Sequence, residues 1–572
     1  MLRPFSLMTL LSTALAASVT SAVPPWAADL GDGTYRNPVL YADYSDPDAI
    51  RVGDDYWLIS SSFSHVPGLP ILHSRDLVNW SLVGHALPRL VPETAFATPQ
   101  PGKGVWAPAI RHHAGRFWIY YPDPDFGLYV LTADDPRGPW SAPTLVKAGR
   151  GLIDPCPLWD DDGSLYLIHG WAHSRAGFAN VLSLLRLSAD GTHVEEDLGI
   201  LIDGHKVPGC TTLEGPKLYR RNGWYYVFAP AGGVKQGWQS VFRARALTGP
   251  YEHRIVLAQG TTPINGPHQG ALVDTPTGEE WFLHFQDQHA YGRVVHLQPV
   301  VWKNDWPVIG NDPDGDGTGE PVLVFRKPDV GPALAGGEPV ESAAGRETPD
   351  HRSTAGQRQP YETPLPVGAA RVAPPLAAIP CSDEFASPEL GLQWQWQANP
   401  RAEWLSLTAR PGWLRLFAHP VATGNLYHAP QLLLQKLPAP AFTVTTKLDF
   451  THAAAGDAAG LIVFGYDYAW LGVRDGKLVH VVVKHAHQQP VRTETPLEVP
   501  VAGPCFLRLV VREGAHCEFS HSTDGRHYTP IGTPFVANVS RWVGAKMGLF
   551  AAGPGSSAAD WEFFHVEPVS AR

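Results

Sequence analysis

Three acidic residues occupy the same position in a pattern that recurs along the chain. Asp46, Asp154 and Glu214 each stand four residues before an aliphatic residue, and a turn and an aromatic-rich run follow. The stretches read DPDAIRVGDDYWLI, DPCPLWDDDGSLYLI and EGPKLYRRNGWYYV. Carboxyl groups can transfer protons to and from a substrate in general acid–base catalysis. A single such acid would mean little because most are solvated, but three at one phase of a repeat predict a shared site.

Two further stretches share the pattern but begin with other residues. WAPAIRHHAGRFWIYY places Trp106 at the same phase, and HQGALVDTPTGEEWFLHF places His268 there. The five starts, 46, 106, 154, 214 and 268, are separated by 60, 48, 60 and 54 residues. Each unit has room for four strands, which is the signature of a β-propeller blade. In a five-bladed propeller the inner strands begin around one end of the axis, so these five residues are expected to converge there.

The bulk properties favour a secreted protein with more than one domain. The chain has 572 residues, is 44% hydrophobic and carries a net charge of -11, with no basic run. Nucleic acid and anionic membrane surfaces are therefore not expected partners. Residues 1–22 combine an early Arg, a short apolar stretch and small residues, which predicts a signal peptide and a secreted or periplasmic location. No later segment has 18 apolar residues in a row, so no membrane span is expected.

The rest of the chain divides by composition. The propeller is predicted over residues 23–327, and residues 328–380, rich in Pro, Gly and Ala, predict a linker. From residue 381 to 572 short strand patterns return without helix patterns, which predicts an all-β sandwich. The five cysteines give no disulfide framework; a Cys156–Cys210 bridge is conceivable, but buried thiols are favoured. The Asp312–Gly317 stretch imitates the start of a calcium loop, yet a surface turn explains it better.

The motifs together resemble glycoside hydrolase family 43. The resemblance rests on YADYSDPDAIRVGDDYWLISSSF, GVWAPAI, LIDPCPLWDDDG, TLEGPKLY and AYGRVVHLQPVVW, in order over residues 35–327. The C-terminal part resembles the concanavalin-like sandwich that follows the propeller in β-xylosidase and α-L-arabinofuranosidase members. The fold implied is a five-bladed β-propeller, a linker and a concanavalin-like β-sandwich.

The resemblance also implies an inverting mechanism and residue roles. Asp46 matches the general base, Glu214 the general acid, and Asp154 the third acid, which modulates and orients Glu214. The implied substrate contacts are Arg293, Phe63, Trp106, Trp171 and His268. His268 matches an axial histidine that holds water, or calcium in some members. Neighbouring acids, Asp48, Asp160 and Asp161, are interpreted as turn residues.

Inversion in one step has independent chemical requirements. A protonated carboxyl group must reach the leaving oxygen while an ionised carboxylate activates water on the opposite face, at a separation of about 6.5–9.5 Å. A nearby Asp154 charge and aromatic walls would disfavour ionisation of Glu214. Asp46 is expected to stay ionised by accepting hydrogen bonds. No cofactor is needed for this chemistry.

Three functions remain open from the sequence. The favoured one is exo-acting removal of terminal α-L-arabinofuranose or β-D-xylose from plant oligo- or polysaccharides, because the sandwich is expected to close one end of the cleft. A non-catalytic carbohydrate-binding protein would be favoured by loss of an acid, and all three are present. An endo-arabinanase would require an open cleft, because the polysaccharide chain must extend through it. Asp383 and Asp560 could share a structural calcium, and the oligomeric state is unknown.

Overall fold

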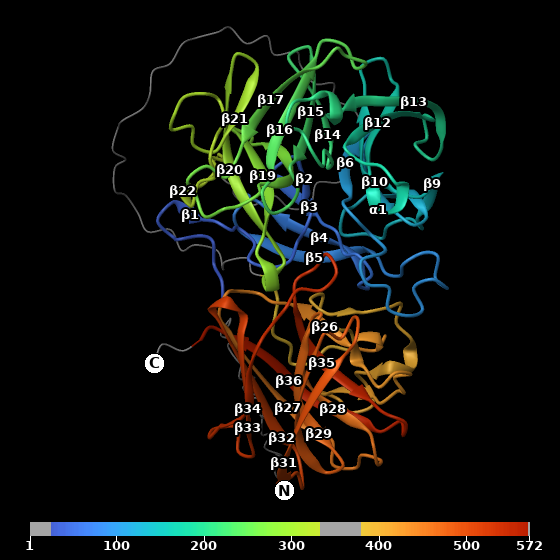
Figure 1. Ribbon diagram of the computed structural model, residues 1–572, viewed down its shortest axis with the longest axis vertical. Helices are drawn as coiled ribbons and strands as arrows, with labels where there is room; N and C mark the ends of the chain where they lie inside the picture. Colours follow the sequence, from blue (N-terminus) through green and yellow to red (C-terminus); the bar gives the residue numbers. More distant parts are fainter. Residues whose placement is uncertain (1–23, 332–378, 570–572) are drawn as a thin grey trace, which may run out of the picture.

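The computed structural model describes residues 24–331 and 379–569, which form two β domains in contact (Figure 1). The predicted signal peptide and most of the predicted linker lie outside the described residues. The upper body in Figure 1 is the propeller and the lower one is the sandwich. No helix of the described residues is long and apolar enough to cross a membrane.

The predicted five-bladed propeller is confirmed, with five antiparallel four-stranded sheets, each built from consecutive strands. Blade I contains β2 (Asp48–Val52), β3 (Asp55–Ile59), β4 (Gly68–Ser74) and β5 (Trp80–Leu87). Blade II contains β6 (Ala109–His113), β7 (Arg116–Asp123), β8 (Gly127–Ala133) and β9 (Thr144–Ala148). Blade III contains β10 (Leu152–Trp159), β11 (Leu165–Trp171), β12 (Val181–Leu187) and β13 (Val194–Asp203), with the short helix α1 (His173–Ala176) after β11.

The last two blades follow the same plan. Blade IV contains β14 (Lys217–Arg221), β15 (Trp224–Ala231), β16 (Trp238–Ala244) and β17 (Glu252–Leu257). Blade V contains β18 (His268–Asp274), β19 (Glu280–Asp287), β20 (Arg293–Lys303) and β21 (Trp306–Ile309). The 3₁₀ turns η1 (Gly204–Lys206) and η2 (His289–Tyr291) lie between strands, and β1 (Thr34–Arg36) pairs with β22 (Val324–Arg326) beside the ring.

The ring is held by apolar side chains between neighbouring blades. Separate buried clusters join blade I to II, II to III, III to IV, IV to V and V back to I. The alternation of apolar residues in the inner strands supplies both faces of each blade, as packed sheets require. The closure between blades I and V includes an ion pair from Arg51 to Asp274 and reciprocal backbone bonds between Leu40 and Val295.

The second domain is the predicted β-sandwich of two seven-stranded antiparallel sheets. One sheet has the order β23 (Gln395–Trp396), β26 (Leu433–Lys436), β35 (Lys546–Ala552), β28 (Ala458–Phe464), β29 (Tyr468–Arg474), β30 (Lys477–Lys484) and β31 (Val491–Pro500). The other has the order β24 (Leu405–Ser406), β25 (Leu414–Phe417), β36 (Ala558–Glu567), β27 (Phe442–Asp449), β32 (Cys505–Arg512), β33 (His516–Ser522) and β34 (Thr529–Val536). The turns η3 (Ala402–Trp404), η4 (Leu426–His428) and η5 (Glu513–Ala515) complete it.

The domains share a buried interface. Tyr291 of the propeller packs into the sandwich core, where its hydroxyl donates to the Pro440 carbonyl at 2.8 Å and accepts from the Ala515 amide at 2.8 Å. The backbones of Val66 and Trp396 exchange two hydrogen bonds. These direct contacts fix the sandwich relative to blades I and V, the two blades nearest to it in Figure 1.

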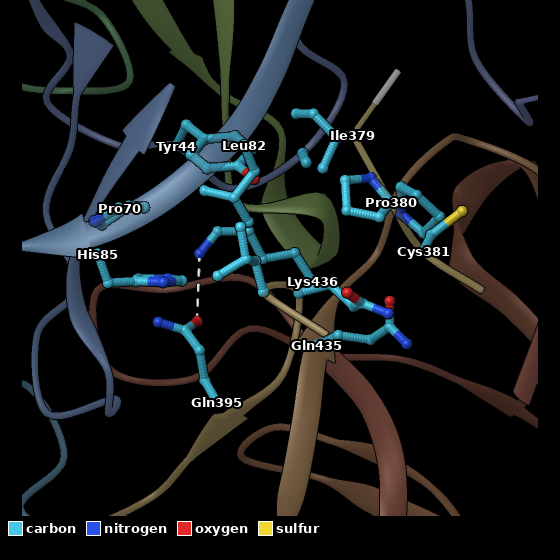
Figure 2. A pocket seen from close by; sticks show the side chains of 14 residues that line it. Tyr44, Pro70, Leu82, His85, Ile379, Pro380, Cys381, Gln395, Gln435 and Lys436 are labelled. Carbon is cyan, nitrogen blue, oxygen red and sulfur yellow. Dashed lines mark hydrogen bonds between the residues drawn. The ribbon is translucent and has the colours of Figure 1, made fainter. Parts of the chain in front are cut away.

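Part of this interface is polar. Figure 2 shows the Lys436 side chain reaching past Tyr44 toward His85, with its ammonium donating to Gln395 Oε1 at 3.4 Å. The adjoining cavity has a volume of about 30 Å³, enough for a water molecule. Lys436, which is partly buried, pairs across the sheet with Lys546, which is buried. Two lysine side chains therefore lie side by side between the domains.

Candidate active site

The five residues at equivalent repeat positions all lie at the start of an inner strand. Asp46, Trp106 and Glu214 precede β2, β6 and β14 by two or three residues, and His268 is the first residue of β18. Asp154 departs slightly, being the third residue of β10. A β-bulge between Ile153 and Cys156 sets this local offset, and bulges commonly re-aim side chains near active sites.

Asp46 lies at the propeller end with its carboxylate held by two donors. Ser61 Oγ donates to Oδ2 at 2.5 Å, and the Arg293 guanidinium donates to Oδ1 at 3.1 Å. The residue is 7% exposed and has φ of 55°, in the left-handed region that Asp tolerates better than most residues. Because both partners donate, they stabilise the ionised carboxylate, while lone pairs remain for a water molecule.

Glu214 is more open than the other two acids. Its side chain is 25% exposed, and Oε1 lies 2.8 Å from Nε2 of His268, whose own side chain is 1% exposed. Nδ1 of His268 is buried without a partner among the described residues. His268 therefore holds one oxygen of Glu214 and leaves the other free to face a substrate.

Asp154 connects to Glu214 through the next residue in the chain. Its Oδ2 accepts from the Gly215 amide at 2.7 Å. Gly215 has φ of 58°, and a Cβ there would lie 2.3 Å from the Gln269 side chain, so glycine is required for this approach. Asp154 thus fixes the backbone that carries Glu214.

Burial and charge also link the three carboxyl groups. Burial raises the pKa of Asp154 to about 8, and the charges of Glu214 and Asp46 add to this rise. Asp154 therefore keeps its proton near neutral pH, beside the Glu214 carboxyl group.

The predicted aromatic residues occupy two places. Phe63 and Trp106 pack edge to face with ring centroids 6.2 Å apart. The Trp106 ring also packs edge to face on Trp542 of the sandwich, with ring centroids 6.0 Å apart. Trp171 is the last residue of β11. Its indole N–H donates to Ser183 Oγ at 2.9 Å, and its ring packs on Phe178 with ring centroids 4.8 Å apart. Phe63 and Trp106 therefore form one wall with the sandwich, whereas the hydrogen bond and ring contacts of Trp171 are within its own blade.

The interpretation of Asp48 as a turn residue is wrong. It is the first residue of β2, fully buried, and accepts from the Ile110 amide at 2.8 Å and from Arg111 at 2.7 Å. Lys217 lies 3.6 Å from its other oxygen. Asp48 thus anchors three inner strands below the three acids. The turn interpretation holds for Asp160 and Asp161, which follow β10.

The predicted shared calcium between Asp383 and Asp560 is not supported. The Asp560 carboxylate forms ion pairs with two guanidinium groups: Arg415 Nε lies 2.7 Å from Oδ1, and Arg410 Nη1 lies 3.0 Å from Oδ2. Asp383 instead accepts from Trp394 Nε1 at 2.9 Å. No group of three or more His, Cys, Asp or Glu side chains that could hold a metal occurs in the described ranges, 24–331 and 379–569. For His268 and the Asp312 loop, too, the structure therefore offers no metal cluster.

All five cysteines are free, and Cys156 and Cys210 are buried, so the bridge between them does not form and buried thiols are confirmed.

Two residues that shape the site were missed by sequence reasoning. Ser61 holds Asp46, and its only sequence signal is its place directly after the aromatic strand of blade I. Asp43 accepts from the Arg293 amide at 3.0 Å and from the Gly544 amide of the sandwich at 3.0 Å. A third acid in YADYSDPD could have drawn attention to Asp43, but its partners are about 250 and 500 residues away in the chain.

Comparison with known proteins agrees with this geometry. The family model "Glycosyl hydrolases family 43" matches residues 35–307, and "Beta xylosidase C-terminal Concanavalin A-like domain" matches residues 382–567. A Xylanibacter ruminicola protein is 38% identical over 528 residues, covering 91% of this chain and 86% of the relative. The chain belongs to glycoside hydrolase family 43. It is therefore a glycoside hydrolase.

Other members of family 43 align over the same length. A beta-xylosidase of Formosa agariphila is 31% identical and covers 91% of this chain and 88% of the relative. A non-reducing end alpha-L-arabinofuranosidase of Bacteroides ovatus is 28% identical, and the alignment covers 94% of this chain and 96% of the relative. The crystal structure of a family 43 protein of Bacillus licheniformis superposes with a TM-score of 0.74 at 26% identity, covering 94% of this chain and all of that one.

Proposed function

We propose that this family 43 protein is an exo-acting, inverting hydrolase that releases terminal β-D-xylose or α-L-arabinofuranose from plant oligo- or polysaccharides. The main supporting observation is the contrast between two carboxyl groups. Asp46 accepts hydrogen bonds from two donors, whereas Glu214 is partly open to solvent and its neighbour Gly215 donates to the buried Asp154. The names of the relatives, beta-xylosidase and alpha-L-arabinofuranosidase, support the two pentoses.

The proposed reaction needs only carboxyl groups and water. Asp46 accepts a proton from a water molecule as the water oxygen attacks the anomeric carbon. Glu214 donates its proton to the leaving oxygen as the glycosidic bond breaks. Attack from the face opposite the leaving group inverts the anomeric configuration. Asp154 positions Glu214 through Gly215, and Arg293 positions Asp46, so neither transfers a proton to the sugar.

The sandwich supports exo action. Its segment between β34 and β35 carries Trp542 against Trp106 and is pinned to the propeller by the Gly544 amide on Asp43. A wall at this side leaves less room for a chain to pass through than an open cleft would. The endo-arabinanase alternative is therefore less favoured. The non-catalytic alternative is opposed by the different surroundings of Asp46 and Glu214, which a binding site would not require.

The test combines stereochemistry with one substitution. Proton NMR of early hydrolysis of an aryl β-D-xyloside and an aryl α-L-arabinofuranoside should show the inverted anomer first. A retained anomer would require a nucleophilic carboxylate about 5 Å from the acid and would overturn the role of Asp46. Glu214→Gln should lose activity most on natural glycosides, whose leaving groups need protonation, and least on activated aryl glycosides.

We also propose that the protein acts outside the cytoplasm. The support is the signal-like composition of residues 1–22. Fractionation of the producing cells, with N-terminal sequencing of the mature protein, should find a start near residue 23.

A further inference from the structure

A pocket opens on the outer face of the sandwich sheet that contains β28, β29 and β35. That face carries its own apolar cluster, separate from the core between the two sheets. The irregular segment of residues 418–432 packs on it. The His419 carbonyl in this segment accepts from the Gly553 amide, and Asn425 donates to the Ala486 carbonyl at 2.8 Å. Beside the segment lies the pocket, whose volume of about 310 Å³ is at the lower end of the range for small-molecule sites.

This pocket lies away from the propeller. β35 begins at Lys546, in the domain interface, and ends at Ala552, which lines the pocket. The extended strand between these two residues spans about 20 Å. Figure 1 likewise shows β28, β29 and β31 in the lower part of the sandwich, whereas the propeller is the upper body. A ligand in this pocket would therefore not touch the catalytic acids.

Two aromatic rings line the deep side of the pocket. Trp470 of β29 and Phe550 of β35 pack edge to face with ring centroids 5.1 Å apart. Gly460 pairs with Phe550 across the sheet and makes room for its ring, because a Cβ there would lie 3.1 Å from that ring. Trp470 is only 3% exposed, yet its indole N–H has no hydrogen-bond partner in the described part of the chain. An unpaired donor at this depth favours a ligand that brings an acceptor.

The polar side chains that line the pocket are all donors. They are Trp470, Arg474 and Arg492, and no Asp or Glu is among the described lining residues. The two guanidinium groups share Glu494 as ion-pair partner, with Arg492 Nη2 2.9 Å from its Oε2. Asp475 is more distant, 3.9 Å from Arg474 Nε. Because a guanidinium group has five N–H donors, both arginines keep donors for an anion at the rim.

The other lining residues are apolar or glycine and include Pro420, Val421, Leu426, Ala458, Ala552 and Pro554. A sugar presents hydroxyl groups on all sides, and most of them would lose their partners in such surroundings. An aromatic acid matches the lining better. Its ring can fill the apolar space and its carboxylate can pair with the guanidinium groups, while an oxygen on the ring accepts from the Trp470 N–H.

We propose that this pocket is a binding site for an aromatic carboxylate of the size of a hydroxycinnamate. The site adds a ligand to the protein that is unrelated to pentose release, and the proposal does not rest on the proposed function. One ring with a short acidic side chain suits the volume, whereas a chain of sugar units would not fit within it.

Calorimetry on the full-length protein, with ferulate as the probe, tests the site. Ferulate should bind with one site per chain. Methyl ferulate has the same ring but no charge, so it should bind about tenfold more weakly. D-xylose should not compete with ferulate, because the lining side chains give its hydroxyls no acceptor.

Two substitutions address different parts of the pocket. Arg492→Ala removes a donor at the rim and should weaken ferulate binding about tenfold, with little effect on methyl ferulate. Ala552→Leu places a larger side chain in the pocket and should abolish binding of both probes. The matched control is Arg512→Ala, since Arg512 also pairs with a Glu at 3.2 Å, Glu518, but on the other sheet. It should bind ferulate as the parent does.

The outcomes separate this proposal from the proposed function. Thermal melting checks that each variant folds, and if Ala552→Leu does not, the comparison of ferulate with methyl ferulate in Arg492→Ala still decides. Absence of ferulate binding to the parent, or ferulate binding unchanged by the pocket substitutions, would overturn the site. Binding of D-xylose that Ala552→Leu abolishes would do the same and indicate a sugar site. Failure of the parent to hydrolyse aryl pentosides would overturn only the proposed function.

Discussion

At the residue scale, the three carboxyl groups differ in what surrounds them. Asp46 faces a guanidinium and a hydroxyl, Glu214 faces a histidine and solvent, and Asp154 faces one backbone amide in a buried site. These differences allow residues of similar chemistry to take different roles, because donors favour the ionised form whereas burial favours the neutral one.

Asp154→Asn is expected to stabilise the fold in a pH-dependent way. Burial, with the charge of Glu214, raises the pKa of Asp154 to about 8, so the folded protein holds a proton that the unfolded chain releases near pH 4. The stability of the parent therefore falls as the pH rises from about 4 to about 8. The melting temperature of the variant should exceed that of the parent by an amount that grows over this window and then levels off.

Scanning calorimetry at several pH values between 4 and 9 measures this difference, and the exposed Asp134→Asn serves as the control for loss of one charge. The same variant should show a shifted pH profile of kcat, because the electrostatic interaction between Asp154 and Glu214 is lost. An advantage that shrinks with rising pH would contradict the assignment.

At the element scale, turns rather than strands carry the chemistry, and strands determine where the turns meet. The segment before β2 carries Asp43 and Asp46, the segment before β14 carries Glu214, and the turn before β20 ends at Arg293. Asp43 joins two of these turns to the sandwich, because its two oxygens accept from the amides of Arg293 and Gly544.

Asp43→Asn should weaken catalysis although Asp43 does not touch the substrate site directly. The amide end of Asn cannot accept a hydrogen bond, so one of the two backbone donors loses its partner. A hydrogen bond to a charged group contributes about 1.5–3 kcal/mol, so kcat/KM is expected to fall about tenfold or more as Arg293 and the Trp542 segment loosen.

Steady-state kinetics on an aryl pentoside test this, with separate values of kcat and KM. Asp32→Asn is the matched control, since Asp32 also accepts from a backbone amide, that of Thr34, but at an exposed turn. A lower melting temperature with unchanged kinetics would show that Asp43 is only structural.

At the scale of the whole molecule, the sandwich is part of the catalytic unit through a shared interface. Its core cluster includes propeller residues, and it adds Trp542 to the wall of the site. The interface also contains Lys436 and Lys546 side by side. Asp43 is the acid that favours their charged forms, and both lysines add to the effect of burial in lowering the pKa of the neighbouring His65 imidazole.

Lys546→Met should stabilise the protein most at neutral and acidic pH. Burial lowers the pKa of Lys546 to about 7, Lys436 adds to this shift and Asp43 opposes it. The unfolded chain keeps this proton up to about pH 10.5, so the stability of the parent rises as the pH increases from about 7 to 10.5. The variant lacks the buried charge, so its advantage should shrink over that range.

Thermal melts from pH 6 to 10 measure the effect, and Lys235→Met at an exposed position is the control. An advantage that increases toward alkaline pH would contradict the burial of a charged Lys546 at the interface.

The sequence by itself determined the repeat and therefore the ring. The spacing of Asp46, Trp106, Asp154, Glu214 and His268 predicted five blades and one convergent end, because each blade repeats the same hydrogen-bonded unit and local patterns decide strands and turns. The alternating strands after residue 381 likewise predicted the sandwich.

Only the tertiary structure decided which side chains meet. Ser61 and Asp43 could not be found from spacing, since their partners come from other turns or from the other domain. Asp48 looked like a turn residue because its local pattern is that of a turn, but its burial depends on Arg111 and Lys217 from blades II and IV. Asp560 suggested calcium until two arginines were found on its carboxylate. Side-chain charges and hydrogen bonds are satisfied across long sequence separations, and no local period encodes them.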